Sequence, residues 1–218
     1  SGAVTIVNIC GTTIEEYEEL TRILSDVEGV AAIELNISCP NIKAGGITFG
    51  CNLAGTHDVV QAAKRATHLP VIPKLTPNVT DIASFARVAE EAGADAVSLV
   101  NTFLAMSIDV ETRRSRLANV VGGLSGPAIR PIAVRMVHEC HQAVSIPIIG
   151  MGGITTANDV LEFMIAGASA VQVGTANFVD PYIWKKLMVG LNNYLEKHEI
   201  KRLRDIIGTL EVDLAEEA

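Results

Sequence analysis

The segment Ala31-Ala-Ile-Glu-Leu-Asn-Ile-Ser-Cys-Pro-Asn41 combines a buried strand with a polar end. Its first part is mostly apolar, and Pro40 ends the strand because proline has no N–H for a sheet. Cys39 lies just beyond the strand, between Asn36 and Asn41. A small thiol surrounded by amide side chains at the carboxyl end of a strand is suited to proton transfer. The segment therefore predicts one strand–helix unit of an enzyme.

The same pattern recurs along the chain, where apolar, β-branched runs alternate with amphipathic stretches. The runs that predict strands are Val4–Cys10, Ala31–Ile37, Val71–Leu75, Ala96–Val100, Ile146–Ile149 and Ala170–Val173. The stretches that predict helices are Ile14–Ser25, Thr56–Thr67, Thr80–Ala92, Ile129–Ala143, Thr156–Ala166, Tyr182–Lys197 and the short Leu203–Gly208. Strands that are apolar throughout and separated by helices are typical of a parallel sheet covered on both faces.

Residues suited to chemistry follow nearly every predicted strand, which favours a TIM (β/α)8 barrel over an open doubly wound sheet. An open sheet would concentrate such residues at one switch point. A complete barrel has eight βα units and about 250 residues, whereas we count six units in this chain of 218 residues. We therefore expect a single α/β domain over residues 1–218 with an incomplete barrel, six of eight βα units.

Composition limits the class of protein. The chain is 49% hydrophobic, enough for one buried core, and its formal charge of −8 argues against a nucleic-acid surface, which would be basic. No apolar run reaches the roughly 18 residues of a membrane span, and no secretory signal is expected. Cys10, Cys39, Cys51 and Cys140 show no C-x-x-C spacing, so we expect reduced thiols and a cytoplasmic location. Cys10 and Cys140 are predicted to be ordinary buried residues.

Two glycine-rich segments predict a phosphate site. Gly150-Met-Gly-Gly153 follows one predicted strand, and Gly174-Thr175 follows the next. Glycine lets backbone N–H groups approach an anion, and the N-terminus of a following helix adds its positive end. The loops after the last two strands are the usual phosphate position of a TIM barrel. The alternative is that these glycines serve only tight turns with positive φ.

Almost thirty residues separate Asn101 from the next predicted helix. Loops longer than about 15 residues are commonly lids or binding loops. We expect a lid followed by a phosphate loop at Gly122-Gly-Leu-Ser-Gly126. Arg113, Arg114 and Arg116 in the lid either contact a ligand or, for at least two of them, form a solvated patch.

Polar side chains at the predicted strand ends suit a flat, hydrogen-bonding ligand. Lys74 needs an anionic or electron-rich partner if its ammonium is buried; the alternative is a lysine that extends to the rim. Asparagine is disfavoured in strands, and an amide both donates and accepts, as a heterocycle with C=O and N–H groups requires. The residues in such positions are Asn8, Asn36, Asn41 and Asn101, with the hydroxyl of Thr102 beside the last. Asn78 is predicted only to cap a turn.

The histidines do not predict a metal site. His57, His68, His138, His141 and His198 all lie on predicted helices or at their ends, away from the carboxyl ends of the strands. Their spacing matches no metal-binding motif. We expect surface or packed helix histidines and no metal.

Taken together, the motifs resemble class 1B dihydroorotate dehydrogenase, catalytic subunit, over essentially the whole chain. The segments that carry the resemblance are Glu34-Leu-Asn-Ile-Ser-Cys-Pro-Asn41, Lys74-Leu-Thr-Pro-Asn78, Asn101-Thr102, Gly122-Gly-Leu-Ser-Gly-Pro127, Gly150-Met-Gly-Gly153 and Val173-Gly-Thr-Ala-Asn-Phe178. The Gly45-Gly46 loop favours the 1B form over the fumarate-using 1A form. Cys51-Asn-Leu-Ala54 departs from the family's Thr-Asp-Pro-Glu, which predicts weaker capping of the next helix.

The resemblance implies a TIM barrel that holds FMN at its carboxyl face and oxidises dihydroorotate to orotate in de novo pyrimidine biosynthesis. It implies that Cys39 is the base that removes the C5 proton while hydride leaves C6 for N5 of the flavin. Asn36, Asn41, Asn101 and Thr102 would hold the substrate. FMN would be held by Asn8, Asn36, Lys74, Val100, Gly126, Gly152, Gly153, Gly174 and Thr175. Subunits of this kind pair with a subunit carrying FAD and a 2Fe–2S cluster that uses NAD, as a homodimer or heterotetramer.

On this alignment, two further βα units of the family precede Val4. If the chain is complete, two parallel sheet edges are exposed, and we expect weak flavin binding and little turnover unless another chain or segment completes the barrel. Two other interpretations stay open. One is an inactive barrel fragment that serves only as a folding or assembly unit. The other is a phosphate-binding barrel isomerase or aldolase in which Lys74 forms a Schiff base.

Overall fold

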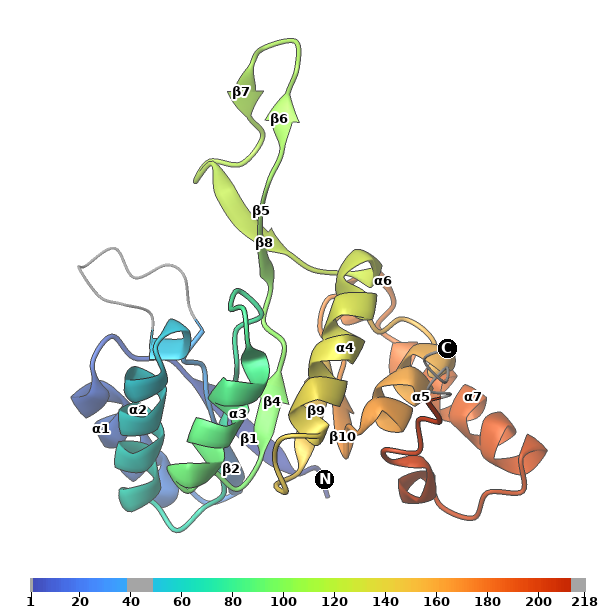
Figure 1. Cartoon of the computed structure of the whole chain (residues 1–218), viewed down its shortest axis with the longest axis horizontal. Coiled ribbons are helices and arrows are strands. Elements are labelled where there is room, and N and C mark those ends of the chain that lie inside the picture. The colour runs from blue at the N-terminus through green and yellow to red at the C-terminus, as the bar shows by residue number, and fades with distance from the viewer. Residues whose placement is uncertain (1, 39–48, 213–218) are drawn as a thin grey trace, which may run out of the picture.

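The structure is a computed structural model that describes residues 2–38 and 49–212, and these residues form an α/β fold. Its central strands are flanked by helices, and a long ribbon projects from one end (Figure 1). The central strands are β1 (Thr5–Ile9), β2 (Val30–Leu35), β3 (Val71–Pro73), β4 (Val97–Leu99), β9 (Ile148–Met151) and β10 (Ala170–Gln172). Each of them overlaps a strand predicted from the sequence, so the predicted alternation is confirmed.

The central strands are all parallel and follow the order of the chain. One sheet has the order β1-β2-β3 and a second has the order β4-β9-β10. A parallel bridge between Lys74 and Ser98 joins the two sheets. The described strands therefore run β1-β2-β3-β4-β9-β10, which brings their carboxyl ends to the same side of the molecule.

Most of the predicted helices are confirmed with small changes in their bounds. They are α1 (Ile14–Ser25), α2 (Leu53–Arg65), α3 (Ile82–Glu91), α4 (Arg130–His141), α5 (Ala157–Ala166) and α7 (Ile183–Lys197). The structure adds the short α6 (Ala176–Val179) and the 3-10 turns η1 (Phe49–Cys51) and η2 (Pro127–Ile129). The short helix predicted at Leu203–Gly208 is the 3-10 turn η3 (Leu203–Ile206). From α1 to α5, each helix packs against the next along the chain, and α7 packs against α5. Across the described ranges, no helix combines the length and the apolar character that crossing a membrane requires.

The start of α2 has a side-chain cap. Asn52 is the N-cap residue, and its side-chain oxygen accepts a hydrogen bond of 3.0 Å from the N–H of Gly55. Asparagine is among the best N-cap residues because its short side chain reaches the free N–H groups of the first turn. The N-cap hydrogen bond is therefore present, whereas the first turn of α2 has no acidic residue, so the weaker capping stays a prediction.

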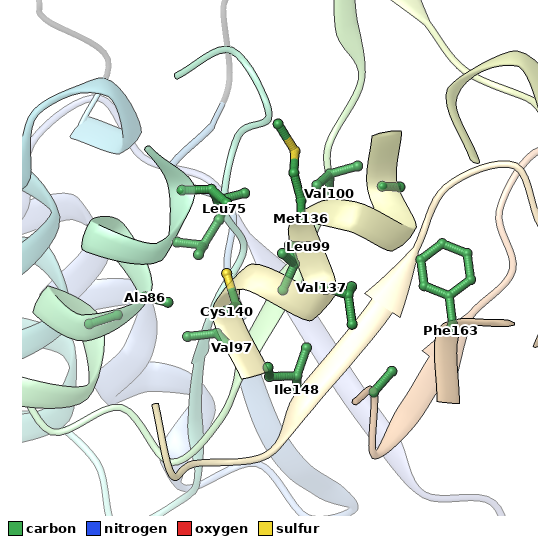
Figure 2. Close-up of a cluster of buried hydrophobic side chains, with 14 of the residues drawn as sticks. Leu75, Ala86, Val97, Leu99, Val100, Met136, Val137, Cys140, Ile148 and Phe163 are labelled. Atoms are coloured by element: carbon green, nitrogen blue, oxygen red, sulfur yellow. The ribbon is translucent and has the colours of Figure 1, made fainter. Parts of the chain in front are cut away.

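The main core lies between the strands and the helices that cover them (Figure 2). Val97 and Leu99 of β4 and Ile148 of β9 are buried with Val137 and Cys140 of α4. Burial raises the pKa of the Cys140 thiol to about 12. Because the thiolate is the reactive form, Cys140 is an inert packing residue. Its predicted burial is confirmed.

Cys10 is exposed, so the prediction that it is buried was wrong. It follows β1, which pairs only with β2 among the strands that the structure describes. Within residues 2–38 and 49–212, one edge of β1 therefore has no strand partner, and its apolar residue Ile6 is exposed as well. An apolar composition predicts a strand, but the burial of that strand depends on its position in the sheet.

Residues 103–124, which were predicted to be a long loop, form an antiparallel ribbon that shortens the predicted phosphate loop (Figure 1). The role of this segment as a lid stays a prediction. The ribbon consists of β5 (Phe103–Met106), β6 (Ile108–Asp109), β7 (Arg114–Ser115) and β8 (Val121–Leu124). β5 pairs with β8, and β6 pairs with β7. Gly122 and Gly123 lie inside β8, so only Ser125 and Gly126 remain as a loop. A side chain on Gly123 would collide with Thr102, which explains a glycine inside this strand.

The side chain of Asn78 forms hydrogen bonds to the start of the ribbon. Its Nδ2 donates to the carbonyl of Thr102 (3.0 Å), and its Oδ1 accepts from the N–H of Leu104 (2.9 Å). Asn78 therefore does more than cap a turn, which was the role predicted for it. Arg113, Arg114 and Arg116 are all exposed near the tip of the ribbon.

Candidate active site

A cavity of about 330 Å³ opens at the carboxyl ends of β3, β4, β9 and β10. Cavities of this size take small molecules or parts of cofactors. Nine of the residues predicted to bind cofactor or substrate line it: Lys74, Val100, Asn101, Thr102, Gly126, Gly152, Gly153, Gly174 and Thr175. The strand order brings these residues together although up to about a hundred positions separate them in the chain.

Three glycines of the cavity have a left-handed backbone. Gly126, Gly152 and Gly153 have φ of +91°, +132° and +75°. A Cβ on Gly153 would lie only 2.6 Å from the carbonyl oxygen of Gly126. The positive φ values agree with the alternative interpretation, in which these glycines serve tight turns. The glycines also leave the cavity wall free of side chains, as an anion site requires. A Cβ on Gly174 would have no atom within 4 Å, so the backbone of Gly174 borders open space.

Gly150 has a different role from the one predicted. It belongs to β9, and a Cβ on it would lie 2.6 Å from a ring atom of Phe163 in α5. The residue lets the helix approach the strand closely and does not line the cavity.

The N-terminus of α5 is already occupied by a side chain of the helix itself. The carboxylate of Asp159 accepts hydrogen bonds of 2.8 Å from the N–H groups of both Thr155 and Thr156. Burial raises the pKa of the Asp159 carboxyl, but these N–H groups and the guanidinium of Arg130 outweigh it and hold the pKa below its ordinary value. The capping box therefore satisfies the N–H groups of Thr155, Thr156 and Asp159, which leaves fewer N–H groups for a phosphate at this helix end.

Hydroxyl groups supply polar atoms on the same side of the cavity. Ser125 Oγ lies 3.2 Å from Thr175 Oγ1, so a hydrogen bond joins the loops before η2 and after β10. Both residues line the cavity with the glycines. Hydroxyl groups both donate and accept, which suits a phosphate or an alcohol.

Lys74 lies directly after β3, and its backbone N–H donates to the carbonyl of Leu35 (2.8 Å). Its side chain is half-buried and lines the cavity. Within the described part of the chain, the ammonium makes no hydrogen bond or ion pair. A half-buried cation in this position favours an anionic or electron-rich ligand.

The amides of Asn36 and Asn101 meet beside the cavity. Asn101 Nδ2 donates to Asn36 Oδ1 (3.3 Å) and also to Ser38 Oγ, and that hydroxyl donates to Asn36 Oδ1 (2.8 Å). The hydroxyl of Tyr17 donates to the carbonyl of Asn36 (2.7 Å), which holds the end of β2. Asn101 lines the cavity, and Asn36 adjoins it through this contact. Of the remaining predicted residues, Cys39 and Asn41 lie outside the described residues.

Sequence reasoning missed a buried carboxylate next to the cavity. Glu34 of β2 is only 4% exposed. It accepts hydrogen bonds from Ser98 Oγ (2.7 Å), from Gln172 Nε2 (2.8 Å) and from Asn8 Nδ2. Asn8 pairs with Glu34 across the strands β1 and β2, so its side chain serves this network and does not line the cavity.

A signal for these residues was present in the sequence. Glu34 and Gln172 each stand inside an apolar run that predicts a strand. A polar side chain in a buried strand needs a partner, because an unsatisfied buried polar group is costly. The partner itself was not predictable, since it lies on a distant strand. Thr155 also lines the cavity and was missed, whereas Ser125 lies in the predicted phosphate loop but was not singled out.

Over residues 2–38 and 49–212, no group of three or more His, Cys, Asp or Glu side chains is placed to hold a metal ion. His141 has a packing role. Side chains on Gly167 or Gly208 would collide with its ring.

The fold and the site define an α/β protein with parallel strands and a polar, glycine-lined cavity at their carboxyl ends. The chain belongs to the dihydroorotate dehydrogenase family, whose family model matches residues 3–195. The enzymes named dihydroorotate dehydrogenase B (NAD(+)), catalytic subunit, from Bacteroides thetaiotaomicron and Pelobacter propionicus are 53% and 52% identical to it over 207 and 206 residues. These alignments cover 95% and 94% of this chain and 68% of each relative. The resemblance to the class 1B catalytic subunit is confirmed.

A solved structure supports the fold independently. The crystal structure of DHODH in complex with ferulenol from Eimeria tenella superposes with a TM-score of 0.76. The superposition covers 91% of this chain and 58% of that chain. At 23% sequence identity it shows the shared fold alone.

Proposed function

We propose that this protein oxidises dihydroorotate to orotate in pyrimidine biosynthesis, with FMN as hydride acceptor. The names of its relatives support this activity. The observation that carries the proposal is the convergence of Lys74, Asn101 and the glycines of three loops on one cavity. A cation, an amide and an open backbone cradle are the groups that a flavin phosphate and a flat heterocyclic substrate require.

The finer fold that we propose is a TIM (β/α)8 barrel, with residues 1–218 as one domain. The described strands would be six successive units of the eight in such a barrel. The hydrogen bond between Glu34 and Gln172 supports a curved sheet, because their strands are not neighbours in the strand order. Only a sheet that curls can bring such side chains together in its interior.

The residues present fit FMN. Gly126, Gly152, Gly153 and Gly174 would hold the phosphate end with Thr175, since their backbones border the cavity without side chains. Val100 and Lys74 also line the cavity, and by the resemblance they would contact the flavin. Asn8 is less suited to a direct contact, because its Nδ2 is bound to Glu34.

The chemistry that FMN supplies when bound is acceptance of the hydride from C6 of the substrate. The ammonium of Lys74 would stabilise negative charge at the ring. The amides of Asn36, Asn41 and Asn101 and the hydroxyl of Thr102 would hold the substrate. Cys39 would remove the C5 proton as a general base, which requires an accessible thiolate.

The relatives are named as catalytic subunits of an NAD(+)-linked enzyme. We therefore propose a separate electron-transfer subunit, carrying FAD and a 2Fe–2S cluster, in a homodimer or heterotetramer. A cytoplasmic location is proposed from the cysteine spacing.

The test is titration of the purified protein with FMN, followed by flavin fluorescence, and an assay of orotate formation with and without the electron-transfer subunit. We expect saturable FMN binding, a change of the flavin spectrum on addition of orotate, and turnover that the second subunit increases. Failure to bind FMN at about 1 mM, the weak end of specific affinity, would overturn the proposal. Binding of FMN without any effect of orotate or dihydroorotate would overturn the substrate assignment.

A further inference from the structure

The carboxylate of Glu34 connects three strands that are not neighbours of one another. Glu34 lies on β2, Ser98 on β4 and Gln172 on β10, the second, fourth and sixth strands of the described order. Alternate strands of a barrel contribute the side chains of one interior layer. Ser98 and Gln172 both donate to Oε1 of Glu34, at 2.7 and 2.8 Å. The three side chains therefore form part of one polar layer inside the sheet.

One member of this polar layer borders the cavity. Gln172 lines the cavity, whereas Glu34 and Ser98 do not. Glu34 is 4% exposed and Ser98 is fully buried. Gln172 is thus the member of the layer that a ligand in the cavity can touch.

The chemistry of Glu34 decides which end of the Gln172 amide faces the cavity. A carboxylate offers only acceptor sites, so the amide group must turn its nitrogen toward Glu34. The amide oxygen, Oε1, then points away from Glu34. Within the described residues, no group donates a hydrogen bond to Oε1 of Gln172. The same constraint turns Nδ2 of Asn8 toward Glu34.

We propose that Glu34 is a positioning residue that fixes the orientation of the Gln172 amide, so that the cavity presents a carbonyl oxygen at this point. The complementary group of the ligand is a donor, an O–H or an N–H. The inference rests on the proposed function only in its choice of FMN as the probe. The sugar-alcohol hydroxyls and the ring imide of FMN are donors of that kind. Without Glu34, the amide is free to rotate and to present its NH₂ group to the same donor, which is repulsive.

The test compares E34Q with E90Q in the full-length protein. Glu90 is a matched control because it also accepts hydrogen bonds from three donors, Ser145 N, Ser145 Oγ and Ile146 N, at a site away from the cavity. We expect E34Q to weaken FMN binding about tenfold, the effect of one lost ligand hydrogen bond. E90Q should leave the dissociation constant within about twofold.

A double-mutant cycle separates positioning from a general structural role. Q172M keeps the length of the side chain and removes both amide atoms. If Glu34 acts through Gln172, adding E34Q to Q172M causes no further loss of FMN affinity. An equal loss from E34Q in both backgrounds, or the same affinity in E34Q and E90Q, would overturn the proposal.

A measurement on the unsubstituted protein covers the case in which E34Q does not fold or the protein does not bind FMN. In nuclear magnetic resonance spectra, one side-chain amide proton of Gln172, assigned by its loss in Q172M, should exchange slowly with solvent. Slow exchange of this proton supports the orientation by Glu34 even if FMN does not bind and the proposed function fails. Fast exchange of both amide protons would overturn the inference whatever the flavin result.

Discussion

Gly153 lies against Gly126 so closely that a Cβ at position 153 would be 2.6 Å from the Gly126 carbonyl oxygen. The two residues belong to loops that follow β9 and β8, and both loops line the cavity. The two loops that are predicted to hold the phosphate therefore pack closely together at this point.

We expect G153A to weaken FMN binding by tenfold or more and to destabilise the protein by about 1–3 kcal/mol. The reason is that the new Cβ would collide with the Gly126 carbonyl oxygen and that alanine is strained at a positive φ. Gly29 is a matched control, with φ +90° and no atom within 4 Å of a Cβ. G29A should lose about 1 kcal/mol of stability and keep its flavin affinity. Fluorescence titration and urea denaturation measure both effects. Equal flavin affinities in the two variants would contradict a role of the Gly126 and Gly153 loops in binding the phosphate.

K74M tests the half-buried cation of the cavity. The substitution keeps the aliphatic length and removes the charge. We expect about tenfold weaker FMN binding and slower flavin reduction by dihydroorotate, because negative charge at the ring loses its partner. K201M removes an exposed lysine and serves as the control. Unchanged flavin affinity and reduction rate in K74M would place the ammonium outside the ligand site.

C39S tests the predicted base. Serine is a much poorer base near neutral pH, so we expect reduction of the flavin by dihydroorotate to slow about 100-fold or more, while FMN affinity stays nearly intact. C51S replaces another cysteine, which is exposed, and should behave like the parent protein. Stopped-flow absorbance of the flavin gives the rate. A loss of both rate and affinity would mean that the role assigned to Cys39 is wrong.

N78A should loosen the ribbon without unfolding the body of the protein. Asn78 makes two hydrogen bonds to the start of the ribbon, at Thr102 and Leu104. A two-stranded ribbon has little stability of its own, so limited proteolysis between residues 103 and 124 should accelerate about fivefold to tenfold. N193A on the surface of α7 is the control. Identical cleavage of both variants would show that other contacts hold the ribbon.

D159N tests the capped start of α5. The folded-state pKa of Asp159 lies below its ordinary value, so its contribution to stability is present above the unfolded pKa and is lost as pH falls through the folded one. At pH 7 we expect D159N to cost about 2–3 kcal/mol, because Arg130 and the helix N–H groups lose a 3% exposed partner. The difference from the parent protein should shrink below about pH 4.

Urea denaturation at several pH values measures this difference. D205N, which removes an exposed partner of Arg202, is the control and should show little change at any pH. A difference for D159N that does not depend on pH would contradict an ionic role for the residue.

Local sequence features predicted most of the elements and many of the cavity residues. Lys74 and Gly152 were identified because each follows an apolar run, and the ends of parallel strands share one side of a sheet. The ribbon was missed because Val121–Leu124 carries two glycines and lacks the alternation typical of a strand. Asn8 was assigned to the cofactor because it lies near the end of a predicted strand and the family resemblance implies that role; no local pattern reveals its partner Glu34.

By itself, the sequence determined the succession of strands and helices and the family, since apolar periodicity and short motifs are properties of neighbouring residues. Only the tertiary structure decided which strand ends share a cavity. It also decided that Glu34 meets Gln172, 138 positions away. The physical reason is that parallel strands bring distant residues into contact, and a buried polar group takes its partner from whatever the curvature of the sheet places beside it.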